Sequence, residues 1–415
     1  MLISPQLAPI WMAFWFSLAL ALGIDLVFLG SSKTLHAEIE LPRTLAIGTV
    51  HHVPLHVTRR VQRTFVADAV LSVSGHLDRL PPQRLEVAGG EGTTTFPFRA
   101  HLRGPVRAET ISLRYPGPLG LLRCTVELGS DAESVVVPDL APVQDAAVRF
   151  FGSSDYRTGF KVERLRGEGS EFESLREYLP GHDPRAIDWK ASARHKRLLV
   201  RQFRAERNHQ VILAMDVGRL MAESVEGLPK LDHAIHAALL LAYVGLRTGD
   251  RVGTYAFDAR YRGHLVPRAG THAFPALRAS LSALEYGAEE TNFTLGLTDL
   301  SARLDRRSLI VVMTDFVDSV AAELMIENLD RLARRHLILF VALRDPFLSR
   351  VIRERPMTAH QVHQAAVVHG YVRERERVIR RLRRTGILCV DAEPAEVRSS
   401  LLNRYLDVKR RERIG

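Results

Sequence analysis

The first apolar run of the chain spans residues 7–24, reads LAPIWMAFWFSLALALGI and contains no charged side chain. Apolar residues continue to Gly30, and Asp25 is the only charge in this extension. A helix of this length, rising about 1.5 Å per residue, reaches across a hydrocarbon core about 30 Å thick. Two tryptophans lie near its start, as interfacial aromatic residues often do. The pattern therefore predicts a transmembrane helix within residues 1–32.

Two other interpretations of this run are a cleaved signal peptide and a buried core helix. A signal peptide usually carries a basic segment before its apolar run, and no Lys or Arg precedes this one. Lys33, Arg43 and an arginine-rich body follow it, so the positive-inside rule places the soluble domains in the cytoplasm. We expect a single-pass protein of the cell inner membrane. Asp25 would then reach the interface or face a partner helix.

Short segments of alternating apolar and polar residues fill residues 37–140, for example AVLSVSG, ETISLRY and TVELG. Gly and Pro separate them about every ten residues, and no helical period is visible. This pattern predicts a small antiparallel β-sandwich. No cluster of catalytic residue types falls within it, so we expect a scaffold or an interaction surface.

A different rhythm begins at residue 208 and continues to residue 411. Continuously apolar segments such as HQVILAMD, SLIVVMTD and HLILFVAL alternate with amphipathic segments of helical period. Strands of this kind, separated by helices, form parallel sheets that are covered on both faces. The prediction for this part is an α/β domain. Its charge run RERERVIRRLRR, at residues 373–384, is most simply a solvated helix face.

Composition narrows the possible partners and reactions. The 415 residues carry 57 Lys and Arg against 47 Asp and Glu, which gives a net charge of +10. The basic residues are scattered among acids without interleaved aromatic residues, so we expect no nucleic-acid partner. Cys124 and Cys389 are too few for a disulfide framework and fit a reducing compartment. No phosphate-binding loop, dinucleotide fingerprint, HExxH helix or G-x-S-x-G elbow occurs, so we expect no enzyme activity.

Two apolar strands of the predicted α/β domain end in aspartates, Asp216 and Asp315. Ligands of parallel sheets gather at the carboxyl ends of the strands, and carboxylate and hydroxyl oxygens suit Mg²⁺. Asp216 and Asp315, together with the hydroxyl of Thr291, therefore form a candidate Mg²⁺ site. The alternative is that the two aspartates only cap the helices that follow them.

This arrangement resembles the von Willebrand factor A domain and its metal-ion-dependent adhesion site. The matching positions are D-V-G-R-L at residues 216–220, Thr291, and M-T-D at residues 313–315. The family's first loop reads D-x-S-x-S, whose two serine hydroxyls complete the metal shell. Here those positions hold Gly218 and Leu220, so the resemblance implies a degenerate adhesion site.

The most charged stretch is residues 171–207, with six carboxylates and nine Lys or Arg side chains around Trp189. Asp183 is positioned to cap a helix that begins at Pro184 and buries Ile187, Trp189 and Ala191 on one side. The following LLVRQF would add an edge strand to the α/β domain. Dense paired charge of this kind is usually structural, here a clamp between domains, and its guanidinium groups also suit recognition of carboxylate or phosphate.

The whole segment, residues 160–207, resembles the signature of the bacterial family called domain of unknown function 58. That signature runs G-x-E-F-x-x-L-R-x-Y-x-P-G-D-D-x-R-x-I-D-W-K-x-x-A-R and is followed by a V-R strand. The chain departs at His182, where the family has Asp, and it shows one membrane helix where many members have two. The resemblance implies work with a MoxR-type AAA+ ATPase. The partner-binding residues predicted here are Arg176, Asp183, Arg185, Asp188, Trp189, Lys190 and Arg194.

Three functional hypotheses follow from the sequence. The first is a membrane-anchored, non-catalytic interaction or scaffold protein that binds a MoxR-type ATPase through the strand-end face. The alternative is a metal-assisted hydrolase with a site at Glu171, Asp183, Asp188 and Arg194. A third hypothesis is that the basic body binds anionic lipid headgroups near the membrane.

Overall fold

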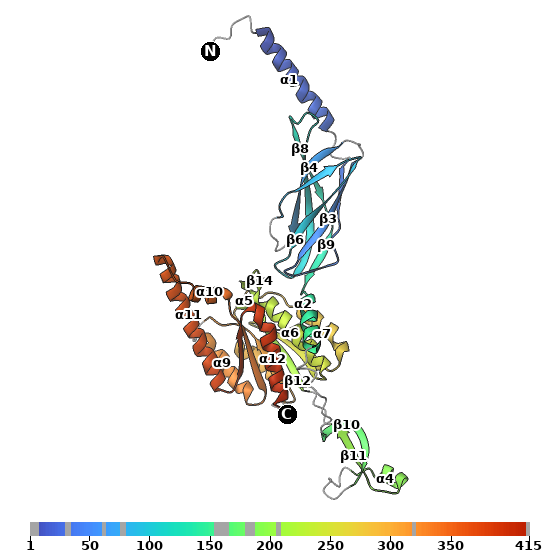
Figure 1. The fold of residues 1–415 in the computed structure, drawn as a ribbon, viewed down its shortest axis with the longest axis vertical. Helices are drawn as coiled ribbons and strands as arrows, with labels where there is room; N and C mark the ends of the chain where they lie inside the picture. Colours follow the sequence, from blue (N-terminus) through green and yellow to red (C-terminus); the bar gives the residue numbers. More distant parts are fainter. Residues whose placement is uncertain are drawn as a thin grey trace. The chain divides into compact units, whose positions relative to one another are not determined.

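The computed structural model describes residues 8–29, 35–59, 64–74, 80–152, 166–178, 187–204, 209–317 and 321–411. The chain divides into two compact units, Met1–Asp139 (unit 1) and Leu140–Gly415 (unit 2). Unit 1 consists of a long helix followed by strands, and unit 2 is a mixed α/β structure (Figure 1).

The N-terminal helix α1 (Ala8–Leu29) is the helix that the apolar run predicts. Its window Ile10–Val27 is long and apolar enough to cross a membrane by length and composition, and 6% of that window is buried within the structure. Large apolar side chains along α1 are therefore exposed, unlike those on the buried core helix of a soluble protein.

Polar contacts tie the end of α1 to the strands of unit 1. The fully buried carboxylate of Asp25 accepts hydrogen bonds from the backbone N–H of Leu119 at 2.8 Å and of Leu122 at 2.7 Å. The carbonyl of Leu29 accepts from the Arg59 guanidinium at 3.0 Å. Asp25 thus contacts the loop between two strands of its own unit, an arrangement that the sequence did not indicate.

The strands of unit 1 form two sheets. The first has the order β1-β3-β6, and the second has the order β2-β9-β7-β4-β5 with β8 also paired to β7. All of these pairs are antiparallel except β2 with β9, so the prediction of an antiparallel arrangement is correct apart from that pair. The bounds are β1 Leu35–Ile39, β2 Thr44–Ala46, β3 Val50–Arg59, β4 Phe65–Ser74, β5 Gln83–Val87, β6 Glu91–Arg99, β7 Gly104–Pro116, β8 Arg123–Gly129 and β9 Glu133–Val137.

Alternation along these strands builds the core of unit 1. Phe96 and Phe98 of β6 and Ile111 and Leu113 of β7 are buried, while most of the residues between them are at least partly exposed. Successive side chains of a strand point to opposite faces, so this period of two gives each sheet one apolar face. The predicted strand pattern is confirmed for this part of the chain.

The charged signature forms a hairpin of its own. The strand β10 (Arg166–Glu177) pairs antiparallel with β11 (Leu199–Arg204) in a separate two-stranded sheet. The expectation that LLVRQF adds an edge strand to the α/β domain is therefore wrong, because its partner is the earlier strand of the signature itself.

The described part of the signature contains one short helix. It is α4 (Trp189–His195), and its N-cap is Asp188, whose side chain accepts from the N–H of Ala191 at 2.9 Å. Ile187 forms an antiparallel bridge with Val200, so the backbone at Ile187 is extended where the prediction placed it in a helix, and the predicted cap Asp183 and helix start Pro184 lie outside the described residues. Trp189 is 69% exposed, which contradicts its predicted burial.

A six-stranded sheet forms the centre of unit 2, in the order β16-β15-β12-β17-β18-β19. Its inner neighbours are parallel, as predicted, but β16 is an antiparallel edge strand paired with β15. The sequence prediction missed β16, whose half-exposed alternation differs from the continuous apolar runs of the buried strands. The bounds are β12 Gln210–Asp216, β15 Arg251–Phe257, β16 Tyr261–Arg268, β17 Leu309–Met313, β18 Leu337–Leu343 and β19 Leu388–Ala392.

Helices cover both faces of this sheet (Figure 1). Val211 and Leu213 of β12 belong to a core cluster with α2, α6, α7 and α12, whereas Ile212 and Ala214 belong to a cluster with α8, α9 and α11. The helices and short elements of unit 2 are α2 Ala141–Gly152, α5 Arg219–Ala222, β13 Ser224–Val225, β14 Leu228–Pro229, α6 Lys230–Arg247, η3 Thr271–Ala273, α7 Phe274–Ser282, α8 Phe293–Ala302, α9 Ala321–Ala333, α10 Pro346–Arg353, α11 Ala359–Arg384 and α12 Pro394–Arg410.

Candidate functional site

The carboxyl edge of the central sheet gathers buried acids. Asp216 is the last residue of β12, Asp315 follows the neighbouring parallel strand β17, and both are almost fully buried. Asp258 follows β15 on the other side of β12 and is fully buried. An isolated carboxylate is costly to bury, so the partners of each acid determine what this edge can do.

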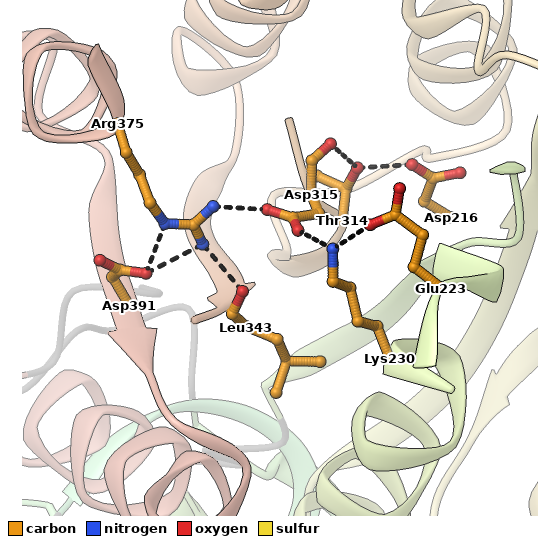
Figure 2. Close-up of polar contacts among 8 residues, drawn as sticks. All are labelled: Asp216, Glu223, Lys230, Thr314, Asp315, Leu343, Arg375 and Asp391. Carbon is orange, nitrogen blue, oxygen red and sulfur yellow. Dashed lines mark hydrogen bonds and ion pairs between the residues drawn. The ribbon is translucent and has the colours of Figure 1, made fainter. Parts of the chain in front are cut away.

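The partners of Asp216 are neutral donors. One of its carboxylate oxygens, Oδ1, accepts from the N–H of Gly218 at 2.8 Å and from the hydroxyl of Thr291 at 2.6 Å. The other oxygen, Oδ2, accepts from the hydroxyl of Thr314 (Figure 2). Burial raises the pKa of Asp216 to about 6, although these three hydrogen bonds favour its charged form and lower the pKa.

Asp315, by contrast, lies between two cations. Its Oδ2 is 2.7 Å from the Nζ of Lys230, and its Oδ1 accepts from Nη1 of Arg375 at 2.7 Å (Figure 2). Lys230 also donates to Glu223 at 2.7 Å. Burial lowers the pKa of Lys230, but the two carboxylates outweigh burial, so the net pKa is raised and the ammonium stays charged.

Arg375 extends this network to the far strand of the sheet. Its Nε and Nη2 donate to the carboxylate of Asp391 at 3.1 and 3.0 Å, and Nη2 also donates to the carbonyl of Leu343 at 3.0 Å. Burial disfavours the charged guanidinium, but Asp315 and Asp391 raise the pKa of Arg375 above its ordinary value. One network, with Lys230, Arg375 and Asp315 buried and Asp391 and Glu223 at its more exposed ends, therefore joins α6, β18, β19, α11 and the segments after β12 and β17.

Sequence reasoning identified Asp216, Thr291 and Asp315 but missed Lys230, Thr314 and Arg375. Arg375 lies in the charge run that was interpreted as a solvated face, yet its side chain is 4% exposed. The signal was present, because Arg375 precedes the buried Val378, Ile379 and Leu382 by three, four and seven residues. That spacing places them on one side of a helix.

The geometry does not fit the Mg²⁺ ion that the resemblance to the adhesion site implies. Both oxygens of Asp315 face cations of the same chain, and both oxygens of Asp216 accept hydrogen bonds. At Gly218, an added Cβ would lie 2.2 Å from the hydroxyl oxygen of Thr291, so Thr291 fills the space of a side chain there. Within the described residues, no group of three or more His, Cys, Asp or Glu could hold a metal. The Mg²⁺ assignment stays a prediction, and Lys230 already places a positive charge beside Asp315.

Four of the predicted partner-binding residues of the signature lie on or next to α4, and the others do not join them in the described part of the structure. Asp188 caps α4, and Trp189, Lys190 and Arg194 are exposed on that helix. Arg176 lies in β10 opposite Val200, but its side chain is outside the described part of the structure. The same holds for the side chain of Glu171 and for all of Asp183 and Arg185, so their roles stay predictions.

The second part of the signature hairpin and most of the strand-end residues lie in a part of the chain that matches a known family. Residues 174–354 match the family described as protein of unknown function DUF58. The DUF58 match covers less than half of the 415 residues and includes Asp216, Lys230 and Asp315. Arg375 and Asp391 lie beyond the DUF58 match, although they complete the same buried network.

The curated relatives that the chain matches are named as uncharacterized proteins. Uncharacterized proteins of Mycobacterium bovis and Mycobacterium tuberculosis are each 27% identical over 185 residues, which is 44% of this chain. The chain spans 57% of the length of these curated relatives.

Solved structures give only weak likenesses. An alpha-2-macroglobulin mutant of Salmonella is 27% identical and covers 25% of this chain and 7% of its own, with a TM-score of 0.19. Proximal thread matrix protein 1 from the mussel byssus is 12% identical and covers 47% of this chain and 45% of its own, with a TM-score of 0.27. At TM-scores this low, neither likeness assigns a fold or a function.

Proposed function

We propose that this protein is a membrane-anchored, non-catalytic interaction protein. In this proposal α1 crosses the inner membrane, the strands of unit 1 and all of unit 2 lie in the cytoplasm, and unit 2 is a von Willebrand A-like domain. Its strand-end edge binds a protein partner, a MoxR-type AAA+ ATPase. The partner comes from the resemblance of the signature segment, and the cytoplasmic side comes from the basic residues that follow α1.

The observation that supports binding over catalysis is the internal neutralisation of the strand-end acids. Asp216 accepts from two hydroxyls and an N–H, and Asp315 pairs with Lys230 and Arg375. Asp258 accepts from the Arg262 guanidinium at 2.8 Å. Asp315 and Asp258 are held by cations of the same chain and are therefore poorly placed to bind a metal, and the contacts of all three acids hold the loops of this edge in a fixed arrangement.

The order of the strands supports the von Willebrand A-like assignment. The central strand β12 carries the aspartate of the D-V-G-R-L loop at its carboxyl end and lies between two parallel neighbours, with helices on both faces of the sheet. Ligands of open parallel sheets bind at this edge. A partner-binding face is therefore expected here even when the metal is replaced by the protein's own cations.

Exposed residues also follow the strands at this edge. Arg219, in the first turn after β12, lies 3.1 Å from the carboxylate of Glu290, and the two side chains are 58% and 86% exposed. Val317, shortly after Asp315, is 46% exposed. A surface ion pair of this kind contributes little to stability, which leaves both charges available to a partner.

Co-purification from detergent extracts tests the proposal. The full-length chain should retain a MoxR-type ATPase of its own organism, and Arg219→Glu should weaken that retention because it reverses a charge at the carboxyl edge. The matched control is Arg334→Glu at the opposite edge, where Arg334 also forms an exposed pair, with Asp330 at 3.5 Å. Equal retention by the two variants would place the interface elsewhere, and no retention in any nucleotide state would contradict the proposal.

The hydrolase alternative has no supporting contact among the described residues. Asp188 is occupied as the cap of α4, and the side chains of Glu171 and Asp183 lie outside the described part. It stays a prediction of the sequence.

A further inference from the structure

The loop between β7 and β8, residues 117–122, is folded around the carboxylate of Asp25 in α1, and we call it the anchor loop. The N–H groups of Leu119 and Leu122 donate to the two oxygens of Asp25. The loop closes on itself, because Gly117 donates to the carbonyl of Leu122 at 2.9 Å and Gly120 donates to the carbonyl of Gly117 at 3.2 Å. These contacts fix the position of the loop along α1.

Two glycines make this close fit possible. A Cβ added at Gly117 would lie 2.3 Å from an oxygen of Asp25, so no side chain fits there. Gly120 has φ +72°, a conformation that residues with a side chain rarely adopt. The hydrogen bonds from backbone N–H groups compensate the carboxylate for its loss of water.

The position of Asp25 sets the depth of the anchor loop. Asp25 precedes the last residue of α1, Leu29, by four residues, or about 6 Å along the helix axis at about 1.5 Å per residue. The neighbouring residues Leu26 and Val27 are 66% and 75% exposed and belong to the apolar surface of α1. A helix that spans the bilayer has its acyl-to-headgroup boundary at such a place.

The anchor loop presents apolar side chains at this depth. Leu119 is 52% exposed and Leu121 is 47% exposed, and Pro118 and Gly120 beside them are exposed as well. Single exposed leucines are common on proteins, but these two lie in a loop that is bonded to an apolar helix. Arg123, which follows the loop, is exposed and long enough to reach lipid phosphates from the water side.

We propose that the anchor loop inserts Leu119 and Leu121 into the boundary between headgroups and acyl chains, beside α1. This inference rests on the proposed anchorage by α1 and goes beyond it, because the first unit then meets the lipid surface at a second place. Asp25 is the positioning residue that holds the loop at the required depth. The partner is the bilayer itself, since the apolar surface continues from α1 to the loop.

The test uses the full-length chain with single cysteines carrying an environment-sensitive fluorophore. Cys124→Ser and Cys389→Ala first remove the native thiols. A label is then placed at one position by Leu119→Cys, Leu121→Cys or Val135→Cys. Val135 is the matched control, because it is 47% exposed like Leu121. Val135 pairs with Pro105, which is eleven residues from Pro116 along β7, or about 36 Å at about 3.3 Å per residue. The label at 135 therefore lies far from the anchor loop, which follows Pro116.

In vesicles that contain lipids with a quencher near the headgroup end of the acyl chain, labels at 119 and 121 should be quenched several-fold more than the label at 135. Equal quenching at all three positions, in a chain that resists carbonate extraction, would overturn the inference and leave the anchor in place. A chain that carbonate removes from the vesicles would overturn the anchor, and the inference with it.

A pair of glycine variants tests the role of Asp25. Gly117→Ala introduces the clash with the carboxylate and should reduce the quenching at 121 without loss of carbonate resistance. Gly129→Ala, at a position with open space around it, should leave the quenching unchanged. Full quenching in Gly117→Ala would show that Asp25 does not position the loop and would contradict that part of the inference.

Discussion

Asp216 and Asp315 follow neighbouring parallel strands and are both buried, but their surroundings differ. The carboxylate of Asp216 accepts hydrogen bonds from neutral donors, and burial raises its pKa to about 6. Asp315 lies between a lysine and an arginine. The difference shows that position at a strand end does not determine the chemistry of a carboxylate. The side chains brought to it by other elements do, and here they come from α6 and α11.

The largest loss of stability is expected from Asp315→Asn. This substitution removes the negative charge between Lys230 and Arg375, so that Lys230 keeps only Glu223 and Arg375 keeps only Asp391 as an acidic partner. Removal of one partner from a buried ion pair typically costs about 3–5 kcal/mol of unfolding free energy. Denaturant unfolding of the full-length chain, followed by a probe in unit 2, measures this loss. The control is Asp330→Asn, which breaks the exposed pair with Arg334 and should cost less than about 1 kcal/mol. Similar losses in the two variants would contradict the role of the buried network.

Asp216→Asn, unlike Asp315→Asn, is expected to stabilise the folded protein, and the size of this effect should depend on pH. A folded pKa of about 6, against 3.8 for the unfolded group, means that the protonated carboxyl stabilises the fold below about pH 4. This stabilisation is lost as pH rises through about 6. The difference between the folded and unfolded pKa of Asp216 corresponds to about 3 kcal/mol of unfolding free energy. Asparagine is neutral at every pH. The unfolding free energy of the Asp216→Asn variant, relative to that of the wild type, should therefore rise between pH 4 and 7.

Unfolding midpoints of wild type and Asp216→Asn at several pH values measure this trend. The slope is the informative quantity, because asparagine also changes the hydrogen bond from Thr314 by a constant amount. A difference between the two proteins that does not vary with pH would show that Asp216 has an ordinary pKa in the folded protein.

A smaller loss is expected from Gly218→Ala beside Asp216. The added Cβ would lie 2.2 Å from the hydroxyl oxygen of Thr291, and overpacking of this kind costs about 1–3 kcal/mol. Thermal unfolding measures the loss. The control is Gly370→Ala within α11, where nothing lies near the added Cβ and alanine should stabilise the helix by about 0.5–1 kcal/mol. An unchanged stability of Gly218→Ala would mean that Thr291 moves freely.

The smallest effect is expected from Mg²⁺ or Mn²⁺ added to the wild-type protein. Since the oxygens of both aspartates are engaged within the chain, calorimetric titration should show no heat and the thermal unfolding midpoint should not change. A midpoint that rises with metal concentration, and no longer rises in Asp216→Asn, would restore the metal site implied by the resemblance.

Local periodicity explains which parts of the fold could be predicted. The apolar run of α1, the period of two in unit 1 and the continuous apolar strands of unit 2 each depend on a few neighbouring residues. The errors arose where pairing with another segment decides the structure, and not the period of the segment itself. The half-exposed strand β16 pairs with β15, and Ile187 is extended because it pairs with Val200.

The sequence by itself determined that a long apolar helix precedes a strand-rich part and an α/β part, and that Asp216 and Asp315 end strands of one sheet edge. Only the tertiary structure decided that Asp25 is bonded to the anchor loop and that Lys230 and Arg375 neutralise Asp315. The reason is physical. Burial patterns repeat at the period of a single element, whereas the partner of a buried charge is chosen by packing between elements that lie 60 to 97 residues apart in the chain.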